Sequence, residues 1–415
     1  MREEAEEICW GEDETRVDFG CLYENRGKLL RLAYERYTPD AQYRSFVLEN
    51  QDWLEDYALF MALKEHFRGK PWQSWSICLM MRFPGVLETY REELRDNISF
   101  HYFLQFVFFQ QWKALRSYAN EKGIRIVGDV PIYVPLDSAD VWANPQLFQL
   151  DPSCRPKMVA GCPPDSFSAD GQLWGNPLYD WEKMKQTGYD WWIRRLKAAA
   201  RMYDVVRLDH FRGFESYWSI PALDKTAING SWQPGPGMDF INAVRKALPD
   251  LDFIAEDLGY VTSEVRKLQE DSGYPGMKVL EFAFDADSNN EYLPHTYKKN
   301  TVCYTGTHDN MPLKQWFEQS CEKTVTFAKK YVAEQDPIWG MIRLCLSSVS
   351  ELAVVQMQDY LGLGADARMN FPGTRSGDNW TWRAGKNYLN DTLAARIKEL
   401  TGTYGRLAED TRNGD

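Results

Sequence analysis

The strongest candidates for chemistry lie where short apolar stretches of this chain end in charged residues. Val205-Val-Arg-Leu-Asp-His-Phe-Arg-Gly213 reads as a strand that carries an arginine, an aspartate and a histidine to its carboxyl end and stops at a glycine. Because side chains alternate along a strand, Arg207 and Asp209 point to the same face. The guanidinium favours the ionised form of the neighbouring acid, which is the form that a nucleophile needs. Taken alone, such a pair is more often a structural ion pair that closes a strand.

Three other stretches of the chain also place an acid at or near the end of a short apolar run. Ile254-Ala-Glu-Asp-Leu-Gly259 and Tyr304-Thr-Gly-Thr-His-Asp-Asn310 are also short apolar runs that end in acids. In Ile124-Arg-Ile-Val-Gly-Asp-Val-Pro-Ile-Tyr133, Pro131 must end the strand, because proline cannot donate to a ladder, and Asp129 lies near its tip. Acids at the tips of several strands, with helix-sized spacers between them, predict one acidic site at the carboxyl face of an α/β barrel of the (β/α)8 TIM type.

Two of these acids have surroundings that should separate their pKa values. Glu256 follows an apolar strand and has other carboxylates nearby, so its pKa is expected to be raised, and it can hold a proton at neutral pH. Asp209, beside Arg207, is expected to stay ionised. Retaining cleavage of a glycosidic bond uses one carboxyl group of each kind. The ionised group acts as nucleophile, and the protonated group acts first as acid and then as base.

A third acid, Asp309, adjoins His308 and suits hydrogen bonding to vicinal sugar hydroxyl groups. A histidine standing alone in such a position is more often a structural residue. The chain has only five histidines, however, and both His210 and His308 lie inside the acidic motifs. Aromatic residues are abundant, with 16 Trp, 22 Tyr and 21 Phe, and several stand in loop-like sequence, where the apolar face of a sugar is a suitable partner for an exposed ring.

The elements that must position these motifs fall into two predicted regions. Residues 1–120 read as a helical subdomain, with amphipathic helices at 27–34 and 53–66 and a helix at 100–109 that is apolar nearly all round and therefore buried. Residues 121–415 read as the catalytic barrel, with long irregular loop insertions near 135–180 and 214–238. Further helices are expected at 240–248, 263–271, 315–355 and 388–406, and strands near Ile126, Val206, Phe253, Val279, Val302 and Met369.

Composition excludes several classes of partner. The 415 residues carry a net charge of −12 and have a pI near 5.1, so we expect no binding to nucleic acid or to an anionic membrane. Apolar runs of membrane-spanning length do not occur, and the charged start Met1-Arg-Glu-Glu does not resemble a signal peptide, so we expect a cytoplasmic protein. The eight cysteines are scattered without zinc-type spacing, so we expect reduced thiols and no metal site.

The chain as a whole resembles the 4-α-glucanotransferase family, whose members are called amylomaltases in bacteria and disproportionating enzymes in plants. The resemblance runs from about Val17 to the C-terminal helix. The matching signatures are Gly128-Asp-Val-Pro-Ile-Tyr-Val134, Pro163-Pro-Asp-Ser-Phe-Ser168, Gln172-Leu-Trp-Gly-Asn-Pro177, Arg207-Leu-Asp-His-Phe-Arg-Gly213, Ile254-Ala-Glu-Asp-Leu-Gly259, Gly306-Thr-His-Asp-Asn310 and Asn370-Phe-Pro-Gly-Thr374. A chance match of all of them in this order is implausible.

The resemblance implies a role for each motif. It makes Asp209 the nucleophile, Glu256 the acid and base, and Asp309 the stabiliser of the transition state. The residues that it assigns to the substrate are Arg207, His308, His210 and Asp129 at the donor sugar, Asn370, and Asp165, Gln172 and Trp174 in a loop that folds over the glucan.

The implied reaction is transfer of an α-1,4-glucan segment from maltooligosaccharides, starch or glycogen dextrins to the 4-hydroxyl group of glucose or another glucan. It retains the anomeric configuration, needs no cofactor and is expected of a monomer or homodimer. Retention predicts that the carboxyl groups of Asp209 and Glu256 lie about 5 to 5.5 Å apart. The alternatives are a related α-amylase-type hydrolase with the same three acids and an inactive glucan-binding fragment.

The strand count leads to a last expectation. Six strands are expected where a closed barrel needs eight, and none of them precedes the strand of Asp129, so we expect this chain to lack the first two strands. A barrel with such a gap exposes unpaired strand edges, and we therefore expect weak or no activity from this polypeptide alone. An in-frame extension of very roughly 60 to 100 residues is expected upstream of Met1.

Overall fold

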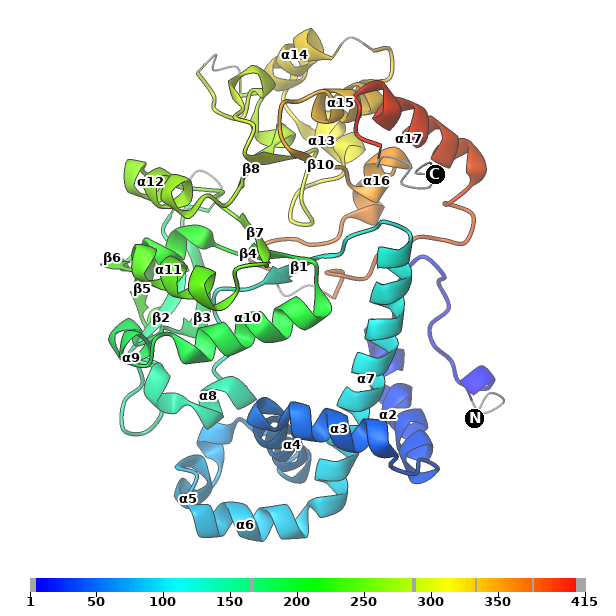
Figure 1. The fold of residues 1–415 in the computed structure, drawn as a ribbon. Helices are drawn as coiled ribbons and strands as arrows, with labels where there is room; N and C mark the ends of the chain where they lie inside the picture. The colour runs from blue at the N-terminus through cyan, green and yellow to red at the C-terminus, as the bar shows by residue number, and fades with distance from the viewer. Residues whose placement is uncertain (1–4, 165–167, 286–288, 333, 375–376, 408–415) are drawn as a thin grey trace. The chain divides into compact units, whose positions relative to one another are not determined.

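The structure is a computed structural model that describes residues 5–164, 168–285, 289–332, 334–374 and 377–407. It forms two compact units. Unit 1 consists of Met1–Ala5 and Gly27–Ser272, and unit 2 consists of Glu6–Arg26 and Gly273–Asp415. In Figure 1 the chain can be followed by colour from the blue and cyan helices of unit 1 to the yellow and red elements of unit 2.

Helices fill the first part of the chain. Their bounds are α2 (Phe19–Glu35), α3 (Ala41–Glu49), α4 (Gln51–His66), α5 (Ile77–Met80), α6 (Pro84–Glu93) and α7 (Arg95–Glu121). The helices predicted at 27–34 and 53–66 are confirmed as parts of α2 and α4. The described residues before Val127 form no strand apart from an isolated bridge between Arg16 and Trp382, which fits the helical interpretation of residues 1–120.

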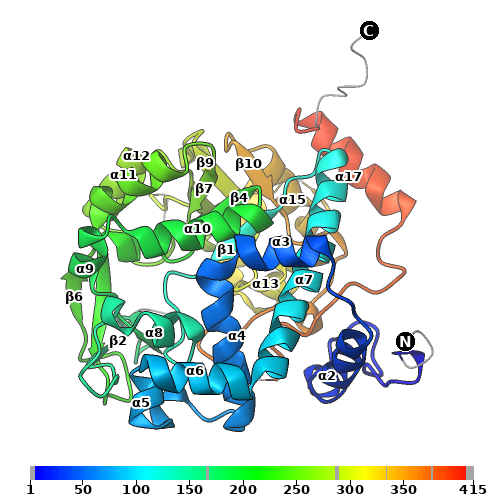
Figure 2. The same cartoon turned by 60° about the horizontal axis from the view of Figure 1, so that its bottom comes forward.

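Helix α7 carries the apolar run at 100–109. Phe100, Phe103 and Phe106 are buried and recur every three residues, so they line one face of the helix. On that face the Tyr34 ring of α2 lies 5.5 Å from the Phe100 ring, centroid to centroid. Phe108 points away from it and is 45% exposed, so the expectation of a helix buried all round is wrong. Figure 2 shows α7 running beside α4, its main packing partner.

The first sheet of unit 1 positions the acidic motifs. Strands β1 (Val127–Val130), β4 (Val205–Leu208) and β7 (Asp252–Ala255) are parallel and lie in the order β1-β4-β7. The register aligns Asp129 with Arg207, and Arg207 with Ile254. Helix α10 (Asp190–Met202) packs on β1 and β4, while α11 (Gly237–Ala247) and α12 (Ser263–Ser272) precede and follow β7. The strands predicted near Ile126, Val206 and Phe253 are confirmed.

A second sheet of unit 1 occupies segments expected to be irregular loops. Strands β2 (Met158–Cys162), β3 (Gln172–Pro177), β5 (Ser216–Pro221) and β6 (Ser231–Pro234) form an antiparallel sheet in the order β3-β2-β5-β6, and α8 (Ala139–Ala143) and α9 (Trp181–Gln186) lie in the same insertions. These strands are short, and a register shift near Gly161 disturbs their alternation. A Cβ at Gly161 would lie 2.1 Å from the Gln172 carbonyl oxygen, so the pairing of β2 and β3 needs glycine there.

Unit 2 contains a parallel sheet of its own. Strands β8 (Gly276–Val279), β9 (Thr301–Tyr304) and β10 (Leu352–Val354) pair in the order β10-β9-β8. The helices are α13 (Leu313–Gln319), α14 (Glu322–Tyr331), α15 (Pro337–Leu346), α16 (Met357–Tyr360) and α17 (Asp391–Thr403). Buried residues from these elements, among them Cys303, Trp316, Ile342 and Leu400, form one core.

Two sequence predictions for this region are wrong. Residues 368–371 have no regular structure, so no strand forms near Met369, and the third strand is β10. The single helix expected over 315–355 is instead three helices followed by β10. Pro337 opens α15, and Asp336 caps that helix by accepting hydrogen bonds from the amides of Ile338 and Trp339, so a new helix begins where a continuous one was expected.

The described residues thus supply six parallel strands in two sheets of three, with helices between them, which confirms the α/β class. Closure into an eight-stranded barrel and the two further strands stay predictions.

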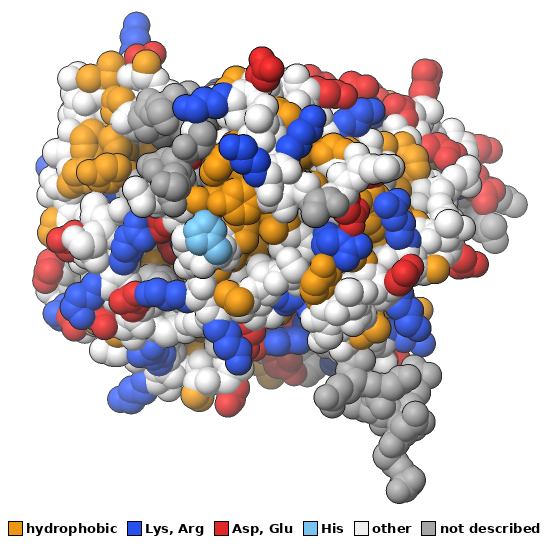
Figure 3. Space-filling view, turned by 90° about the horizontal axis from the view of Figure 1, so that it is seen from above, with side chains coloured by type: hydrophobic (Ala, Val, Ile, Leu, Met, Phe, Trp, Pro, Cys, Tyr) orange, Lys and Arg blue, Asp and Glu red, His pale blue; other side chains and the backbone are white. Residues whose placement is uncertain are grey.

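Across the part of the chain that the structure describes, no helix is both long enough and apolar enough to cross a membrane. All eight cysteines are free thiols. On the face shown in Figure 3, Lys and Arg side chains are interspersed with Asp and Glu side chains.

Candidate active site

The carboxyl ends of β1 and β4 hold an arginine between two aspartates. The register sets Asp129 beside Arg207, whose Nε donates to Asp129 Oδ1 over 2.8 Å while a terminal nitrogen donates to Oδ2. The same terminal nitrogen lies 3.9 Å from Asp209 Oδ1. Burial alone would lower the pKa of Arg207, but its hydrogen bonds to Asp129 and the charges of Asp129, Glu256 and Asp209 raise it above its ordinary value. Arg207 is therefore a permanent cation, with Asp129 as its tighter partner.

Glu256 follows β7 and is held by two backbone amides. Its carboxylate accepts hydrogen bonds from the His210 amide at 2.7 Å and from the Leu258 amide at 3.1 Å. Loss of hydration raises the pKa of Glu256 to about 8, and the charge of Asp209 adds to this rise while that of Arg207 opposes it. The shift has the direction predicted from the sequence. A carboxyl group with such a pKa can donate a proton at neutral pH.

His210 joins the end of β4 to the end of β7. Its φ is 50°, in the left-handed region that few non-glycine residues adopt. Its amide donates to the Glu256 side chain, and the next amide, of Phe211, donates to the Glu256 carbonyl oxygen at 2.9 Å. Burial, together with the charge of Arg212, lowers the pKa of His210 to about 3. The imidazole is therefore neutral at neutral pH and can donate or accept a hydrogen bond without carrying charge.

Strand β3 carries two further residues predicted to bind substrate, Gln172 and Trp174, and places Trp174 next to His210. The Trp174 ring centroid lies 4.9 Å from that of His210 in an edge-to-face arrangement. Trp174 Nε1 donates to Gln172 Oε1 at 3.1 Å, two residues away on the same face of the strand. Both side chains are partly exposed. Asp165, which was predicted to act in the same segment, lies outside the described residues.

In unit 2, two loops bring together the predicted residues His308, Asp309 and Asn370. Asn370 Nδ2 donates to Asp309 Oδ1 at 2.6 Å, and His308 Nε2 lies 3.5 Å from Asp309 Oδ2. The Asn370 amide donates to the His308 carbonyl oxygen at 3.1 Å. Arg368 donates to the carbonyl oxygens of Asp309 and Asn370 at 2.9 and 3.0 Å. The Asp309 carboxylate is thus oriented by an amide at one oxygen and an imidazole near the other.

Two buried acids that the sequence analysis did not single out lie beneath the Asp309 loop. Glu281, two residues past the end of β8, is buried and lies near the Asn310 side chain and the Met311 amide, which oppose the rise of its pKa. Burial raises the pKa of Glu281 well above its ordinary value, and the charge of Asp359 adds to the rise. Asp359 accepts a hydrogen bond from the Thr305 hydroxyl at 2.7 Å. In the sequence, Glu281 stands inside the largely apolar run at 277–284 and so does not stand out as an acid at a strand end.

Replacing Glu281 with glutamine is expected to stabilise the fold increasingly as the pH rises. A carboxyl group whose pKa is raised on folding contributes its full stability below the unfolded pKa and loses it as the pH rises through the folded pKa. Glutamine keeps the shape and stays neutral, so the melting temperature of the variant should gain on that of the parent chain as the pH rises above the ordinary glutamate pKa of 4.5. Thermal unfolding followed by circular dichroism measures the difference. A difference that shrinks over this range would contradict a buried neutral carboxyl group.

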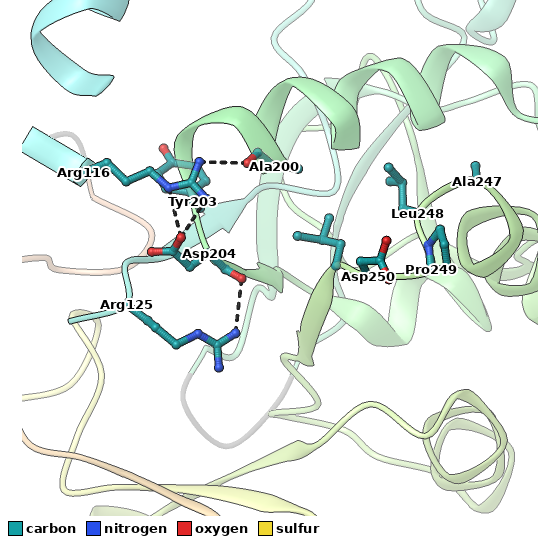
Figure 4. A pocket seen from close by; sticks show the side chains of 10 residues that line it. Arg116, Arg125, Ala200, Tyr203, Asp204, Ala247, Leu248, Pro249 and Asp250 are labelled. Carbon is teal, nitrogen blue, oxygen red and sulfur yellow. Dashed lines mark hydrogen bonds and ion pairs between the residues drawn. The ribbon is translucent and has the colours of Figure 1, made fainter. Parts of the chain in front are cut away.

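A cavity of unit 1 lies at the opposite end of the same strands (Figure 4). Its volume is about 440 Å³, and Arg116, Tyr203, Asp204 and Leu251 line it at the amino ends of β4 and β7. Arg116 donates to Asp204 Oδ1 at 2.7 Å and to the Ala200 carbonyl oxygen at 3.1 Å. Arg116 therefore binds a backbone carbonyl group in the last turn of α10. Active sites of parallel α/β folds lie at the carboxyl ends of strands, so this cavity is separate from the acids described above.

Carboxyl groups at the carboxyl ends of neighbouring parallel strands, one of them with a raised pKa, define an α/β enzyme of the glycoside-processing class. Residues 1–387 match the sequence model of the family described as 4-α-glucanotransferase. The chain belongs to the 4-α-glucanotransferase family and is an enzyme that acts on α-1,4-glucans. The resemblance found in the sequence is thereby confirmed.

Individual relatives agree with this assignment. The chain is 44% identical over 413 residues to the 4-α-glucanotransferase of Clostridium butyricum, a match that covers 98% of this chain and 84% of that protein. It is 47% identical over 403 residues to the 4-α-glucanotransferase of Synechocystis sp., covering 94% and 80%. The amylomaltase of Streptococcus agalactiae in complex with acarbose is 40% identical and matches with a TM-score of 0.95, covering 98% of this chain and 84% of that chain.

Proposed function

We propose that this chain transfers α-1,4-glucan segments by a retaining double displacement that uses Asp209 and Glu256. The observation that carries the proposal is the contrast between these two carboxyl groups at the ends of neighbouring strands. Asp209 lies near the permanent charge of Arg207, whereas Glu256 is desolvated and has a pKa of about 8. Membership of the 4-α-glucanotransferase family supports the same pair of roles.

In the first step, an Asp209 carboxylate oxygen attacks the anomeric carbon of the donor glucan. The bond between that carbon and the glycosidic oxygen breaks, and Glu256 gives its proton to this oxygen, which leaves as the 4-hydroxyl group of the released glucan. The step produces a glycosyl ester of Asp209 and an ionised Glu256. The guanidinium of Arg207 stabilises the negative charge that moves between the two side chains.

In the second step, the 4-hydroxyl group of an acceptor glucan attacks the same anomeric carbon. Glu256 takes the proton of that hydroxyl group, and Asp209 leaves as a carboxylate. Two inversions restore the original α configuration. Because both side chains end the cycle as they began it, the balance of the two steps calls for no cofactor.

The remaining predicted residues are proposed to bind and orient sugar. Asp309 is proposed to stabilise the transition state, with His308 and Asn370 setting its orientation. The residues proposed to bind the donor sugar are Arg207, His308, His210 and Asp129. Asn370 is also proposed to bind substrate, and those proposed to cover the glucan are Asp165, Gln172 and Trp174. We also propose that the strands belong to the (β/α)8 barrel that the resemblance implies.

Replacing Trp174 with alanine is expected to raise the ratio of hydrolysis to transfer. An indole that stacks on the acceptor and excludes water acts on the choice between sugar and water at the second step only. Reducing ends formed from maltotriose measure hydrolysis, and longer products measure transfer. Phenylalanine at the same position is the matched control, because it keeps a ring there. An unchanged ratio with a uniformly lower rate would mean that Trp174 only binds glucan.

Transfer is also expected to decline as the pH rises through about 8. Glu256 must carry a proton to protonate the leaving oxygen, and its pKa is raised to about 8, so the working form is lost above that value. The profile of kcat/KM against pH should therefore show its alkaline limb there. An alkaline limb near 4.5, the ordinary value for glutamate, would contradict the role of Glu256.

Disproportionation of maltotriose tests the proposed function itself. A glucanotransferase should release glucose and form longer maltooligosaccharides without a net increase in reducing ends, because each bond broken is replaced by a new one. A hydrolase with the same acids would increase the reducing ends and form no longer products. A glucan-binding protein would do neither. Chromatography of the products together with a reducing-end assay separates the three outcomes.

A further inference from the structure

Two aromatic side chains of unit 1 have no part in the mechanism above. The rings of Trp232, on β6, and Tyr260, in the loop after β7, are nearly parallel, with an angle of 18° between their planes and 6.4 Å between their centroids. Tyr260 is 66% exposed, and Trp232 is partly exposed. Two exposed, nearly parallel rings side by side offer a flat apolar surface on which a ligand can stack.

A buried arginine supports both rings from one side. The Arg212 guanidinium carbon lies 3.8 Å from the Trp232 ring centroid and 5.9 Å from that of Tyr260. One of its terminal nitrogens donates to the Tyr260 carbonyl oxygen, and the other donates to the Ser216 hydroxyl at 2.9 Å. Arg212 lies over the face of the Trp232 indole, 3.8 Å from its centroid, and the Tyr260 centroid is 5.9 Å from Arg212 and 6.4 Å from the indole centroid. The Tyr260 ring therefore lies to the side of the indole and does not cover its face. The two rings therefore form a platform with the arginine on one side.

The position of Trp232 is also fixed by its strand neighbour. Trp218 lies directly opposite it on β5, with 5.0 Å between the ring centroids in an edge-to-face arrangement. Trp218 Nε1 donates to the Ala227 carbonyl oxygen at 2.8 Å. Gly230 makes room for this indole, because a Cβ there would lie 2.2 Å from Trp218 Nε1. Rings held in this way lose little conformational freedom when a ligand stacks on them.

The platform adjoins the proposed catalytic residues along the chain. Tyr260 follows Glu256 by four residues, and an extended chain spans at most about 3.6 Å per residue, so their Cα atoms are at most about 14 Å apart. Arg212 follows His210 by two residues, and the His210 amide binds the Glu256 carboxyl group. The end of a long glucan bound at Glu256 can therefore reach the rings.

We propose that Trp232 and Tyr260 form a distal subsite that stacks sugars of a long α-1,4-glucan chain. The proposal rests on the proposed function, because it assigns the platform the same substrate. Sugar rings present apolar C–H faces that suit flat aromatic surfaces, and the Tyr260 hydroxyl can hydrogen-bond to sugar hydroxyl groups. Such a subsite favours long glucans over short ones, which end before they reach it.

Replacing Tyr260 with alanine tests this subsite with little risk to the fold, because the ring is mostly exposed. The ratio of kcat/KM for a long linear glucan to kcat/KM for maltotriose is expected to fall about threefold to tenfold, the size that one aromatic contact provides. Phenylalanine at position 260 should restore most of this ratio. The matched control is Tyr118→Ala on α7, which removes a tyrosine of similar exposure, 61%, and should leave the ratio at the parent value.

Trp232→Ala should lower the same ratio, with its melting temperature showing whether the variant folds. Equal changes for long glucan and maltotriose in both variants, or no change in either, would overturn the subsite. Calorimetric binding of the long glucan to Glu256→Gln, with and without the added Tyr260→Ala change, provides a readout with little turnover. Weaker binding with the Tyr260→Ala change supports the subsite even if the parent chain transfers no glucan, whereas equal binding refutes it. Failure of transfer in the parent chain would instead count against the proposed function.

Discussion

Replacing Asp209 with asparagine is expected to reduce glucan transfer at least about a thousandfold, because the amide cannot form the glycosyl ester and covalent catalysis is lost. The fold should persist, since the Asp209 side chain is partly exposed and the hydrogen bond of its amide to the Val130 carbonyl oxygen, at 3.1 Å, does not depend on the side chain. Initial rates of maltotriose disproportionation, with a melting curve for each variant, measure both effects.

Asp250→Asn is a matched control for this substitution. It makes the same chemical change at an exposed aspartate at the amino end of the sheet, and it should leave the rate close to that of the parent chain. If Asp209→Asn kept more than about a thousandth of the parent activity, the assignment of Asp209 as nucleophile would be wrong.

Replacing Glu256 with glutamine is expected to be comparably damaging for ordinary glucans. Glutamine keeps the shape of the side chain but has no proton to give to the leaving oxygen, and loss of general acid catalysis costs about a hundredfold to ten-thousandfold. The effect should depend on the leaving group. With an α-glucosyl fluoride as donor, the fluoride leaves without protonation, so the first step should recover much of its rate while the second stays slow.

Glu264→Gln, at an exposed position on α12, is the matched control for Glu256→Gln and should behave like the parent chain with either donor. An equal loss of the first step with both donors would show that Glu256 supports the site without acting as its acid. The variant should also lack the alkaline limb near pH 8.

The sheet that carries these residues could be predicted because its strands are buried on both faces. Val205-Val206 and Phe253-Ile254 are continuous apolar pairs that stop at polar residues, and such pairs mark both the strand and its end. The antiparallel sheet could not be predicted in this way. Its strands are bulged at Gly161 and partly exposed, so they follow neither a buried nor an alternating pattern.

The details of the site depend on register, which one sequence does not reveal. Arg207 could be paired from the sequence with Asp209, its neighbour on the same face, but its hydrogen bonds go to Asp129, 78 residues away on the adjacent strand. Glu281 was hidden for a related reason. The apolar run at 277–284 extends past the end of β8 at Val279, so from the sequence the acid is taken as part of a strand, whereas it lies in the 3-10 turn Leu280–Phe282.

The central claim of the mechanism is a covalent glycosyl ester on Asp209, and mass spectrometry of the Glu256→Gln variant after reaction with an α-glucosyl fluoride tests it most directly. The ester can form from a donor that needs no proton, and it should persist because the base of the second step is missing. The predicted result is an added mass of one glycosyl group on the peptide that contains Asp209, absent from the Asp209→Asn, Glu256→Gln double variant. Consumption of the fluoride with no labelled protein, or a label on a different residue, would contradict the mechanism.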